Sequence, residues 1–366
     1  MTAGTSVPVR AGFIGGGFMG QVHSRAARAA GAQLVSLFSP NADRARVAAA
    51  TLGFDEAVDS ADLLADDTIN VVHIVSPNTT HFPLALAAIA AGKHVICEKP
   101  LTTSTAQAEE LTAAARSAGV VATVPFVYRF HPMVREARAR ILSGEAGRLL
   151  SIQGAYLQDW LLDADDDNWR VDETIGGWSR AFADIGSHLC DLVEFITGDR
   201  IARLQALKRT VHGHRVSGRQ VTTEDLVGVL FETTTGAIGT LLVSQVAPGR
   251  KNRLHVEISG TTETVEFDQE TPEVLWLGRR AGSELLQRDH TLSKDAMHLS
   301  VLPAGHPLGY QDAFTAFVAD TYAAIRGETR PGLPTFTDGL RAVQLTDAVL
   351  ESTDTGTWAN TMEIHL

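Results

Sequence analysis

The feature that most constrains this chain is a short apolar run, Val9–Ile14, that leads directly into Gly15-x-Gly17-x-x-Gly20. Small and apolar residues at helical spacing follow from Gln21 to Ala30, so the order is strand, tight turn, helix. In such a turn the first glycine lets the chain reverse, the second lets the backbone approach a pyrophosphate, and the third lets helix and strand pack closely. The unpaired N–H groups at the helix start then face the phosphates, and the stretch predicts a dinucleotide-binding turn.

Glycine is common, so this motif is a weak indication until its context is known. Here strand-like and helix-like segments alternate up to residue 125, at Gln33–Phe38, Ala42–Leu52, Val71–Ser76, Thr79–Ala91, His94–Cys97, Thr105–Ala118 and Val120–Pro125. Continuous apolar strands separated by helices indicate a parallel sheet covered on both faces. We therefore expect residues 1–125 to form a doubly wound α/β Rossmann domain, with ligands beyond the carboxyl ends of its strands.

The end of the second strand bears on the choice between NAD and NADP. A carboxylate that binds the adenosine ribose is usual at this place, and here Ser39 occupies it. A serine can bond a 2′-hydroxyl or a 2′-phosphate, and Arg44 lies near enough in sequence to meet a phosphate. Arg44 can equally be a solvated residue of the helix that begins at about Ala42, so NAD and NADP both stay open.

Two later strand ends carry further candidates. Ser76 and Asn78 follow one strand, with His81 just beyond them, and Asn78 is either a turn residue or a contact to the cofactor. The next strand ends in Glu98-Lys99-Pro100. A residue before proline is held out of helical geometry, and the proline itself can be cis, so the Lys99 ammonium is aimed rather than free. The alternative is an ordinary Glu–Lys pair on an exposed loop.

The pattern changes at Phe126, where Tyr128-Arg129-Phe130-His131-Pro132 forms a link to a helix from about Met133 to Ser143. Strand-like runs follow at Leu149–Gln158, Ile201–Val211, Asp225–Glu232, Ala237–Val246, Arg253–Ser259 and Glu263–Phe267. Residues 233–236 and 260–262 are typical of hairpin connections. We expect residues 126–366 to form an α+β domain around a large, mainly antiparallel sheet.

Within this second part, Asp184 and His188 lie near the start of a predicted helix. Their spacing of four places them on one helical face, where the helix dipole favours a neutral, proton-accepting imidazole. Asp184 could then orient His188 or bind a substrate hydroxyl. The alternative is a helix cap with a core histidine, and no third residue stands at a metal-ligand spacing.

Composition narrows the classes of partner. The 31 basic and 43 acidic side chains give a formal net charge of −12, which argues against nucleic acid as a partner. Residues 1–8 do not resemble a signal peptide, no apolar run is long enough to span a membrane, and we expect a cytoplasmic protein. Cys97 and Cys190 lie in apolar stretches and are expected to be buried thiols. The acidic run Asp163–Asp167 is most simply a solvated loop, and we predict no metal site.

Taken together, these motifs resemble the Gfo/Idh/MocA oxidoreductases, a family that includes glucose–fructose oxidoreductase and inositol dehydrogenases. The resemblance rests on the glycine turn with His23, on Ser76-Pro77-Asn78 with His81, on Glu98-Lys99-Pro100 and on Asp184 with His188. It implies an NAD(P)-dependent dehydrogenase that transfers hydride between nicotinamide and a secondary alcohol of a sugar, cyclitol or related polyol. It also implies a homodimer or homotetramer formed through the open face of the C-terminal sheet.

The resemblance assigns roles to individual residues. Lys99, Asp184 and His188 are the expected catalytic residues, with His188 as the base, Lys99 polarising the reacting oxygen or sharing the proton relay, and Asp184 orienting substrate or base. Candidate cofactor-binding residues are Gly15, Gly17, Phe18, Met19, Gly20, Ser39, Arg44, Ser76, Asn78, His81, Glu98, Lys99 and Arg129. Candidate substrate-binding residues are Lys99, Trp169, Arg170, Asp184, His188 and His306.

Two other functions fit nearly the same residues. Some relatives take a hydride from a sugar and return it, which gives glycoside hydrolysis or elimination with the cofactor recycled internally. Others use the cleft as a non-catalytic sensor of cofactor. For Trp169 and Arg170 a packing role is as consistent with the sequence as substrate contact, and His306 taken alone fits a loop.

Overall fold

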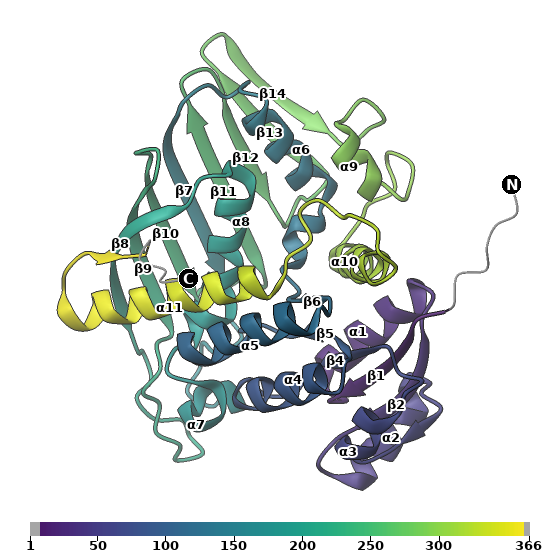
Figure 1. Cartoon of the computed structure of the whole chain (residues 1–366). Coiled ribbons are helices and arrows are strands. Elements are labelled where there is room, and N and C mark those ends of the chain that lie inside the picture. Colours follow the sequence, from purple (N-terminus) through teal and green to yellow (C-terminus); the bar gives the residue numbers. More distant parts are fainter. Residues whose placement is uncertain (1–7, 362–366) are drawn as a thin grey trace, which may run out of the picture. The chain divides into compact units, whose positions relative to one another are not determined.

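The computed structural model describes residues 8–361 (Figure 1). Residues 1–7 lie outside the described residues, and with them most of the segment 1–8 that we predicted not to be a signal peptide. The chain forms two compact units: unit 1 runs to Thr102 and adds Ala106–Pro125 and Tyr310–Leu340, and unit 2 comprises Thr103–Thr105, Phe126–Gly309 and the chain from Arg341 onward. The predicted division into 1–125 and 126–366 stays a prediction, and each unit is described by itself.

Unit 1 is built on a parallel sheet, which confirms the predicted Rossmann architecture. Its strand order is β3-β2-β1-β4-β5-β6, and β1 and β4 mark the point where the winding reverses. The central strands β1, β4 and β5 are almost entirely buried, because helices cover the sheet. Their bounds are β1 Arg10–Ile14, β2 Gln33–Phe38, β3 Glu56–Ala57, β4 Val71–Ile74, β5 His94–Cys97 and β6 Ala122–Thr123.

The helices of unit 1 begin and end where local chemistry requires. The Asn41 side chain accepts a hydrogen bond from the N–H of Arg44 at the start of α2, and Gly53 ends this helix with φ of 74°. Helix α10, from a distant part of the sequence, packs against α1. The helix bounds are α1 Phe18–Ala29, α2 Ala42–Leu52, α3 Ser60–Ala65, α4 His81–Ala90, α5 Thr105–Ala118 and α10 Tyr310–Ile325.

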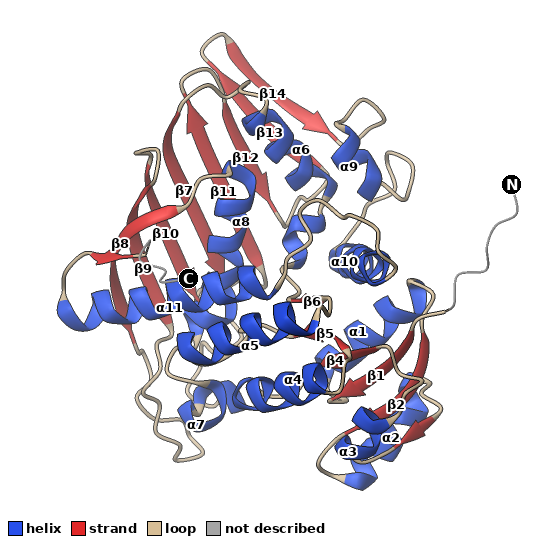
Figure 2. Ribbon diagram, viewed as in Figure 1, coloured by secondary structure: helices blue, strands red, loops and turns tan. Residues whose placement is uncertain are grey.

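Unit 2 contains a nine-stranded sheet in the order β14-β13-β12-β11-β7-β10-β9-β8-β15 (Figure 2). The predicted hairpins are present, because β9 pairs antiparallel with β10 and β11 with β12. The sheet is mixed rather than wholly antiparallel, since β7 and β10 pair in parallel. The strands are β7 Leu149–Leu157, β8 Ile201–Arg209, β9 Leu226–Thr233, β10 Ile238–Ser244, β11 Arg253–Gly260, β12 Thr264–Asp268, β13 Val274–Arg279, β14 Gly282–Gln287 and β15 Ala359–Asn360.

One face of this sheet forms the core of unit 2. Alternate residues such as Phe231, Val256 and Phe267 are at most 1% exposed, and α6 and α8 pack on this face. The cysteines are free and buried as expected, and burial raises the pKa of each thiol. No helix among residues 8–361 is both long and apolar enough to cross a membrane. The helices are α6 Pro132–Leu142, α7 Glu173–Gly176, α8 Ser187–Thr197, α9 Lys294–Leu299 and α11 Phe336–Thr355.

Candidate functional site

In unit 1 the predicted cofactor residues gather at one edge of the sheet. Ile14 at the end of β1 is in register with Phe38 at the end of β2 and with Ile74 at the end of β4. Ile74 in turn is in register with Cys97 at the end of β5. The loops that follow these four strands therefore begin side by side, at the edge where doubly wound sheets bind their ligands.

The glycine turn has the geometry that a pyrophosphate requires. A Cβ on Gly15 would lie 2.7 Å from the Val75 carbonyl oxygen, and one on Gly20 would lie 2.9 Å from the Gly15 oxygen, so the fold itself needs both glycines. A Cβ on Gly17 would meet nothing within 4 Å. No side chain caps the N-terminus of α1, so its first N–H groups stay available to an anion. The residues present fit a dinucleotide, which would lie in the space beside Gly17.

The side chains near the expected adenosine and phosphate positions are accessible. Phe18 is 72% exposed at the start of α1, and Met19 beside it is half-buried. Ser39 is half-buried at the end of β2, and Arg44 is exposed on the first turn of α2. Their contacts with a cofactor stay predictions.

The loop after β4 is organised by hydrogen bonds of its own. The hydroxyl of Thr80 bonds the Pro77 carbonyl and the Ser76 hydroxyl, each at 2.6 Å, and Thr80 makes no side-chain capping bond to α4. Asn78 is buried in a 3₁₀ turn. Nε2 of His81 lies 2.9 Å from the backbone carbonyl oxygen of Ser76, and Nδ1 lies 2.8 Å from that of Pro100. His81 thus braces the loops after β4 and β5, and burial lowers its pKa.

The loop after β5 holds Glu98 and Lys99. The Glu98 N–H donates to the Ile74 oxygen at 2.9 Å, which continues the β4–β5 pairing by one residue. Its carboxylate is buried, accepts the Lys99 N–H at 3.0 Å and lies 3.1 Å from Nε2 of His23. Lys99 is half-buried, and the Lys99–Pro100 peptide bond is cis. These contacts do not fit the alternative of an exposed Glu–Lys pair.

In unit 2 the expected catalytic helix begins with a π-helical turn, Phe182–Gly186, which continues into α8. This differs from the regular helix that we predicted, and such turns are frequent at functional sites. The buried carboxylate of Glu224 anchors the turn, because it accepts the N–H groups of Arg180 and Phe182 and the Ser179 hydroxyl. Asp184 therefore lies within the π turn, and His188 within the first turn of α8.

Polar partners surround the Asp184 carboxylate. Nε of Arg170 lies 3.5 Å from one oxygen, and the Gln245 amide donates to the other at 2.8 Å. The Arg170 guanidinium stacks 4.3 Å from the centre of the Trp169 ring. Thus three of the predicted substrate residues, Trp169, Arg170 and Asp184, form one cluster. Gln245 is a site residue that our sequence reasoning missed, and its signal is a polar residue near the end of the strand predicted over Ala237–Val246.

The imidazole of His188 is 7% exposed and lies among aromatic rings. It packs edge-on against Phe126 and Tyr128, with ring centres 5.6 and 5.2 Å apart, and near Tyr156. The Tyr128 and Tyr156 hydroxyls bond each other and Asn252. Burial raises the pKa of Tyr128, and the Asp184 charge adds to this effect. From the sequence we predicted that Tyr128 lies in the segment that links the two domains, but not that its ring packs against His188.

Two predicted residues lie away from this cluster or are otherwise engaged. The buried Arg129 guanidinium donates Nε–H to Asp191 at 2.8 Å and forms an ion pair with it. Its role toward the cofactor stays a prediction. His306 is exposed in a loop, and its carbonyl oxygen accepts from Arg288 at 2.7 Å. Its contact with substrate is likewise untested by this geometry.

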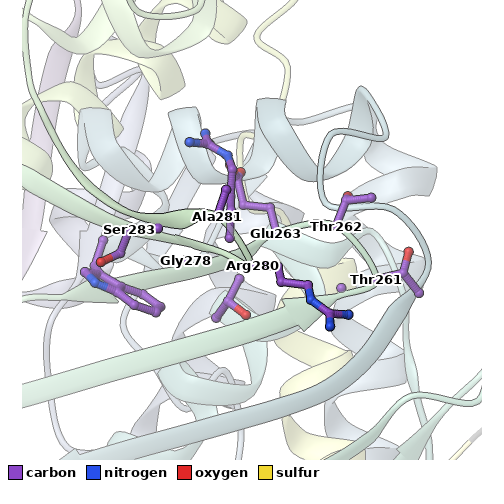
Figure 3. Close-up of a pocket in the computed structure, with 12 residues that line it drawn as sticks. Thr261, Thr262, Glu263, Gly278, Arg280, Ala281 and Ser283 are labelled. Carbon is purple, nitrogen blue, oxygen red and sulfur yellow. The ribbon is translucent and has the colours of Figure 1, made fainter.

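A separate pocket of about 560 Å³ lies at the hairpin ends of the unit 2 sheet (Figure 3). Glu263 contributes to its lining, and this carboxylate is held by Arg279 at 2.5 Å and by Arg140 at 2.9 Å. None of the predicted site residues lines the pocket. Within residues 8–361 no three His, Cys, Asp or Glu side chains are grouped to hold a metal ion.

Each unit thus carries one half of the chemistry of a dehydrogenase. Unit 1 offers a glycine turn, open helix N–H groups and a lysine at a strand end. Unit 2 offers a histidine and a carboxylate with polar partners, which can exchange a proton with a hydroxyl and hold it.

Comparison with known proteins agrees with both halves. The model of the oxidoreductase family with an NAD-binding Rossmann fold, GFO/IDH/MocA, matches residues 9–126, and that of the GFO/IDH/MocA C-terminal domain matches residues 134–266. Levoglucosan dehydrogenase from Pseudarthrobacter phenanthrenivorans is 31% identical, over 96% of this chain and 98% of that protein.

Solved structures extend the likeness to the whole fold. A levoglucosan dehydrogenase in complex with NADH and levoglucosan superimposes with a TM-score of 0.91 at 29% identity, over 98% of this chain and 100% of the other. An inositol dehydrogenase homologue from Azotobacter vinelandii, complexed with NADH and myo-inositol, gives 0.85 at 27% identity, over 97% and 98%. The matching family models, the shared fold and the near full-length relative establish that this chain belongs to the GFO/IDH/MocA oxidoreductase family.

Proposed function

We propose that the protein is an NAD-dependent dehydrogenase that transfers hydride between nicotinamide and a secondary alcohol of a sugar, cyclitol or related polyol. The observation that carries the proposal is that one chain holds both an open glycine turn, in unit 1, and the Asp184 cluster with His188, in unit 2. NAD is preferred to NADP, because the matching family model is NAD-binding and the solved relatives hold NADH.

The residues of unit 1 bind the cofactor and prepare the reacting oxygen. The N–H groups at the start of α1 would hold the pyrophosphate, and the loops after β4 and β5 would reach the ribose and nicotinamide. When bound, the nicotinamide supplies the hydride chemistry. The Lys99 ammonium donates a hydrogen bond to the substrate oxygen and stabilises the negative charge that develops there.

The residues of unit 2 bind the substrate and move its proton. His188 takes the hydroxyl proton in oxidation and returns it in reduction, which requires a separation of about 3 Å from the hydroxyl oxygen. The Asp184 carboxylate accepts a hydrogen bond from a neighbouring hydroxyl of the substrate. Arg170 and Gln245 fix the orientation of this carboxylate. Oε1 of Gln245 is buried and has no hydrogen-bond partner among the described residues, so it suits a second hydroxyl donor.

The substrate class is tested with the purified protein and a panel of levoglucosan, myo-inositol, D-xylose and glucose, each with NAD⁺ and with NADP⁺. We expect net reduction of the cofactor, strongest with a cyclic polyol that presents adjacent secondary hydroxyls. The His188→Ala variant is the control for reduction by contaminants. Release of a sugar without net reduction would instead indicate hydrolysis or elimination with recycled cofactor. Tight cofactor binding without any turnover would indicate a sensor.

We also propose that the protein is a homodimer or homotetramer assembled through the outer face of the unit 2 sheet. Cross-strand register places Leu207, Gly228 and Leu242 in one row of this face, and Ile238 lies on the same face of β10, four residues before Leu242. Leu207 is 80% and Ile238 58% exposed, which is unusual for an unpartnered sheet. A cytoplasmic location stays a prediction.

Sedimentation tests this assembly with two charge-introducing variants. Ile238→Lys should give a smaller species than the wild type, because burying an ammonium in an apolar interface is costly. Val301→Lys is the matched control, since Val301 is 68% exposed but lies in a loop outside the sheet. A wild type that sediments as a monomer at all concentrations would contradict the proposal.

A further inference from the structure

Four buried polar side chains of unit 1 form a continuous chain that the proposed reaction does not use. Nε2 of His23 lies 3.1 Å from Oε1 of Glu98, and Nδ1 of His23 lies 3.0 Å from Nδ1 of His73. Nε2 of His73 lies 2.8 Å from the Tyr322 hydroxyl. The four residues come from the loop after β5, from α1, from β4 and from α10, and none is more than 6% exposed.

The protons of these four side chains can be placed by counting hydrogen-bond donors and acceptors. Burial raises the pKa of Tyr322 and lowers that of His73 well below its usual range, so Tyr322 keeps its proton and the His73 ring carries one. His73 is the one hydrogen-bond partner of the Tyr322 hydroxyl among the described residues, so Tyr322 donates to Nε2. His73 must then carry its proton on Nδ1 and donate it to Nδ1 of His23.

The same count of donors and acceptors determines which nitrogen of His23 donates to Glu98. Since Nδ1 of His23 accepts from His73, the ring carries its proton on Nε2 and donates it to the Glu98 carboxylate. If His23 were instead doubly protonated, His73 would carry its proton on Nε2. The Tyr322 O–H would then be a buried donor without an acceptor, which is costly. All hydrogen bonds therefore run in one direction, from Tyr322 to Glu98.

This chain of hydrogen bonds ends inside the protein. Phe13 stacks on His73 with ring centres 4.3 Å apart, and Phe314 lies 4.6 Å from the His23 ring. Tyr322 and both histidines have no exposed surface. The chain therefore cannot exchange protons with solvent at its Tyr322 end. Its effect is to orient the Glu98 carboxylate, and hydrogen bonds linked in one direction strengthen one another.

We propose that Tyr322, His73 and His23 are positioning residues, which hold Glu98 so that its carboxylate fixes the Lys99 backbone through the 3.0 Å hydrogen bond from the Lys99 N–H. The proposal rests on the proposed function, in which Lys99 acts on the reacting oxygen. The three residues touch neither substrate nor cofactor. They act on catalysis by fixing the direction in which the lysine leaves the strand end.

The proton positions are tested by nitrogen NMR of the ¹⁵N-histidine-labelled protein without cofactor. His23→Gln and His73→Gln each remove one set of signals and so assign these two rings among the 13 histidines. We expect protonation at Nδ1 for His73 and at Nε2 for His23. A His73 ring protonated at Nε2, or a doubly protonated His23, would overturn the proposal. This measurement needs no turnover, so it stands even if the enzymatic function is wrong.

The effect on Lys99 is tested by removing single atoms far from it. Tyr322→Phe deletes only the hydroxyl that begins the chain, and we expect kcat to fall about 5-fold, the value of one neutral hydrogen bond, with KM for NAD⁺ unchanged. Thr321→Val is the matched control, because it deletes a buried hydroxyl from the same helix whose partners are Phe317 and Thr123. Equal kcat values for the two variants would refute a positioning role.

Two variants at His23 separate the loss of its hydrogen bond to Glu98 from the loss of its side-chain volume. His23→Leu removes the donor to a carboxylate, and we expect a loss in kcat of about 10- to 100-fold. His23→Gln keeps an N–H near the position of Nε2 and should recover most of that loss. If Gln is as poor as Leu, orientation of Glu98 is not the reason. If Lys99→Ala itself retains full activity, the proposed role of Lys99 fails, whereas the NMR result is unaffected.

Discussion

Replacing Gly17 with valine separates cofactor binding from folding. The structure has nothing within 4 Å of a Cβ at this position, and its φ of −77° is accessible to any residue. The variant should therefore fold, with a free energy of unfolding within about 1 kcal/mol of the wild type. Its branched side chain would occupy the space through which the pyrophosphate approaches the N–H groups of α1. Loss of one hydrogen bond to a charged group, about 2 kcal/mol, corresponds to about 30-fold weaker NADH binding.

Isothermal calorimetry with NADH and thermal unfolding measure the two quantities on the same samples. Gly213→Val is the matched control, because Gly213 is exposed in unit 2 and a Cβ there would also meet nothing within 4 Å. Gly15→Val is the opposite case, since φ of 115° and a contact of 2.7 Å should destabilise the fold by more than about 2 kcal/mol. Unchanged NADH affinity in a folded Gly17→Val protein would refute the placement of the dinucleotide.

Two further predictions concern cofactor choice and catalysis. Arg44→Ala should weaken NADP binding more than NAD binding if Arg44 meets a 2′-phosphate, because only NADP loses a charge-assisted contact. Calorimetry with both cofactors decides this, and equal effects would make Arg44 a surface residue of α2. Lys99→Ala and His188→Ala should each lower kcat by about 10²- to 10⁴-fold in steady-state assays, with little change in cofactor affinity for His188→Ala. If the two act as one relay, the double variant is scarcely worse than the worse single variant, whereas multiplying losses would indicate independent roles.

Local sequence was sufficient for much of unit 1. The bounds of β2, α2, β5 and α5 agree with those predicted, because buried apolar runs and helical periodicity are properties of consecutive residues. Strand β13 begins with the apolar run Val274–Leu277, which would have been enough to predict it, and its alternate residues Leu275 and Leu277 are buried. Strand β14 has no buried face at this sheet edge, and β15 has two residues, so neither carries a pattern that a single sequence makes visible.

The candidate site divides in the same way. Lys99 follows a buried strand and Asp184 opens a helical segment, so short motifs were enough to propose them. The partners of these residues come from distant parts of the chain: Gln245 reaches Asp184, Tyr156 lies near His188, and Tyr322 bonds His73 across 249 positions.

What the sequence by itself determined is therefore the order of elements, the glycine turn and the residue types able to do the chemistry. Tertiary structure alone decided the parallel β7–β10 pair, the packing of α10 on α1 and the buried contacts that connect Tyr322 to Glu98. The physical reason is range. Periodicity and turn propensity act over a few residues, whereas burial and hydrogen-bond partners depend on which distant segments share a core.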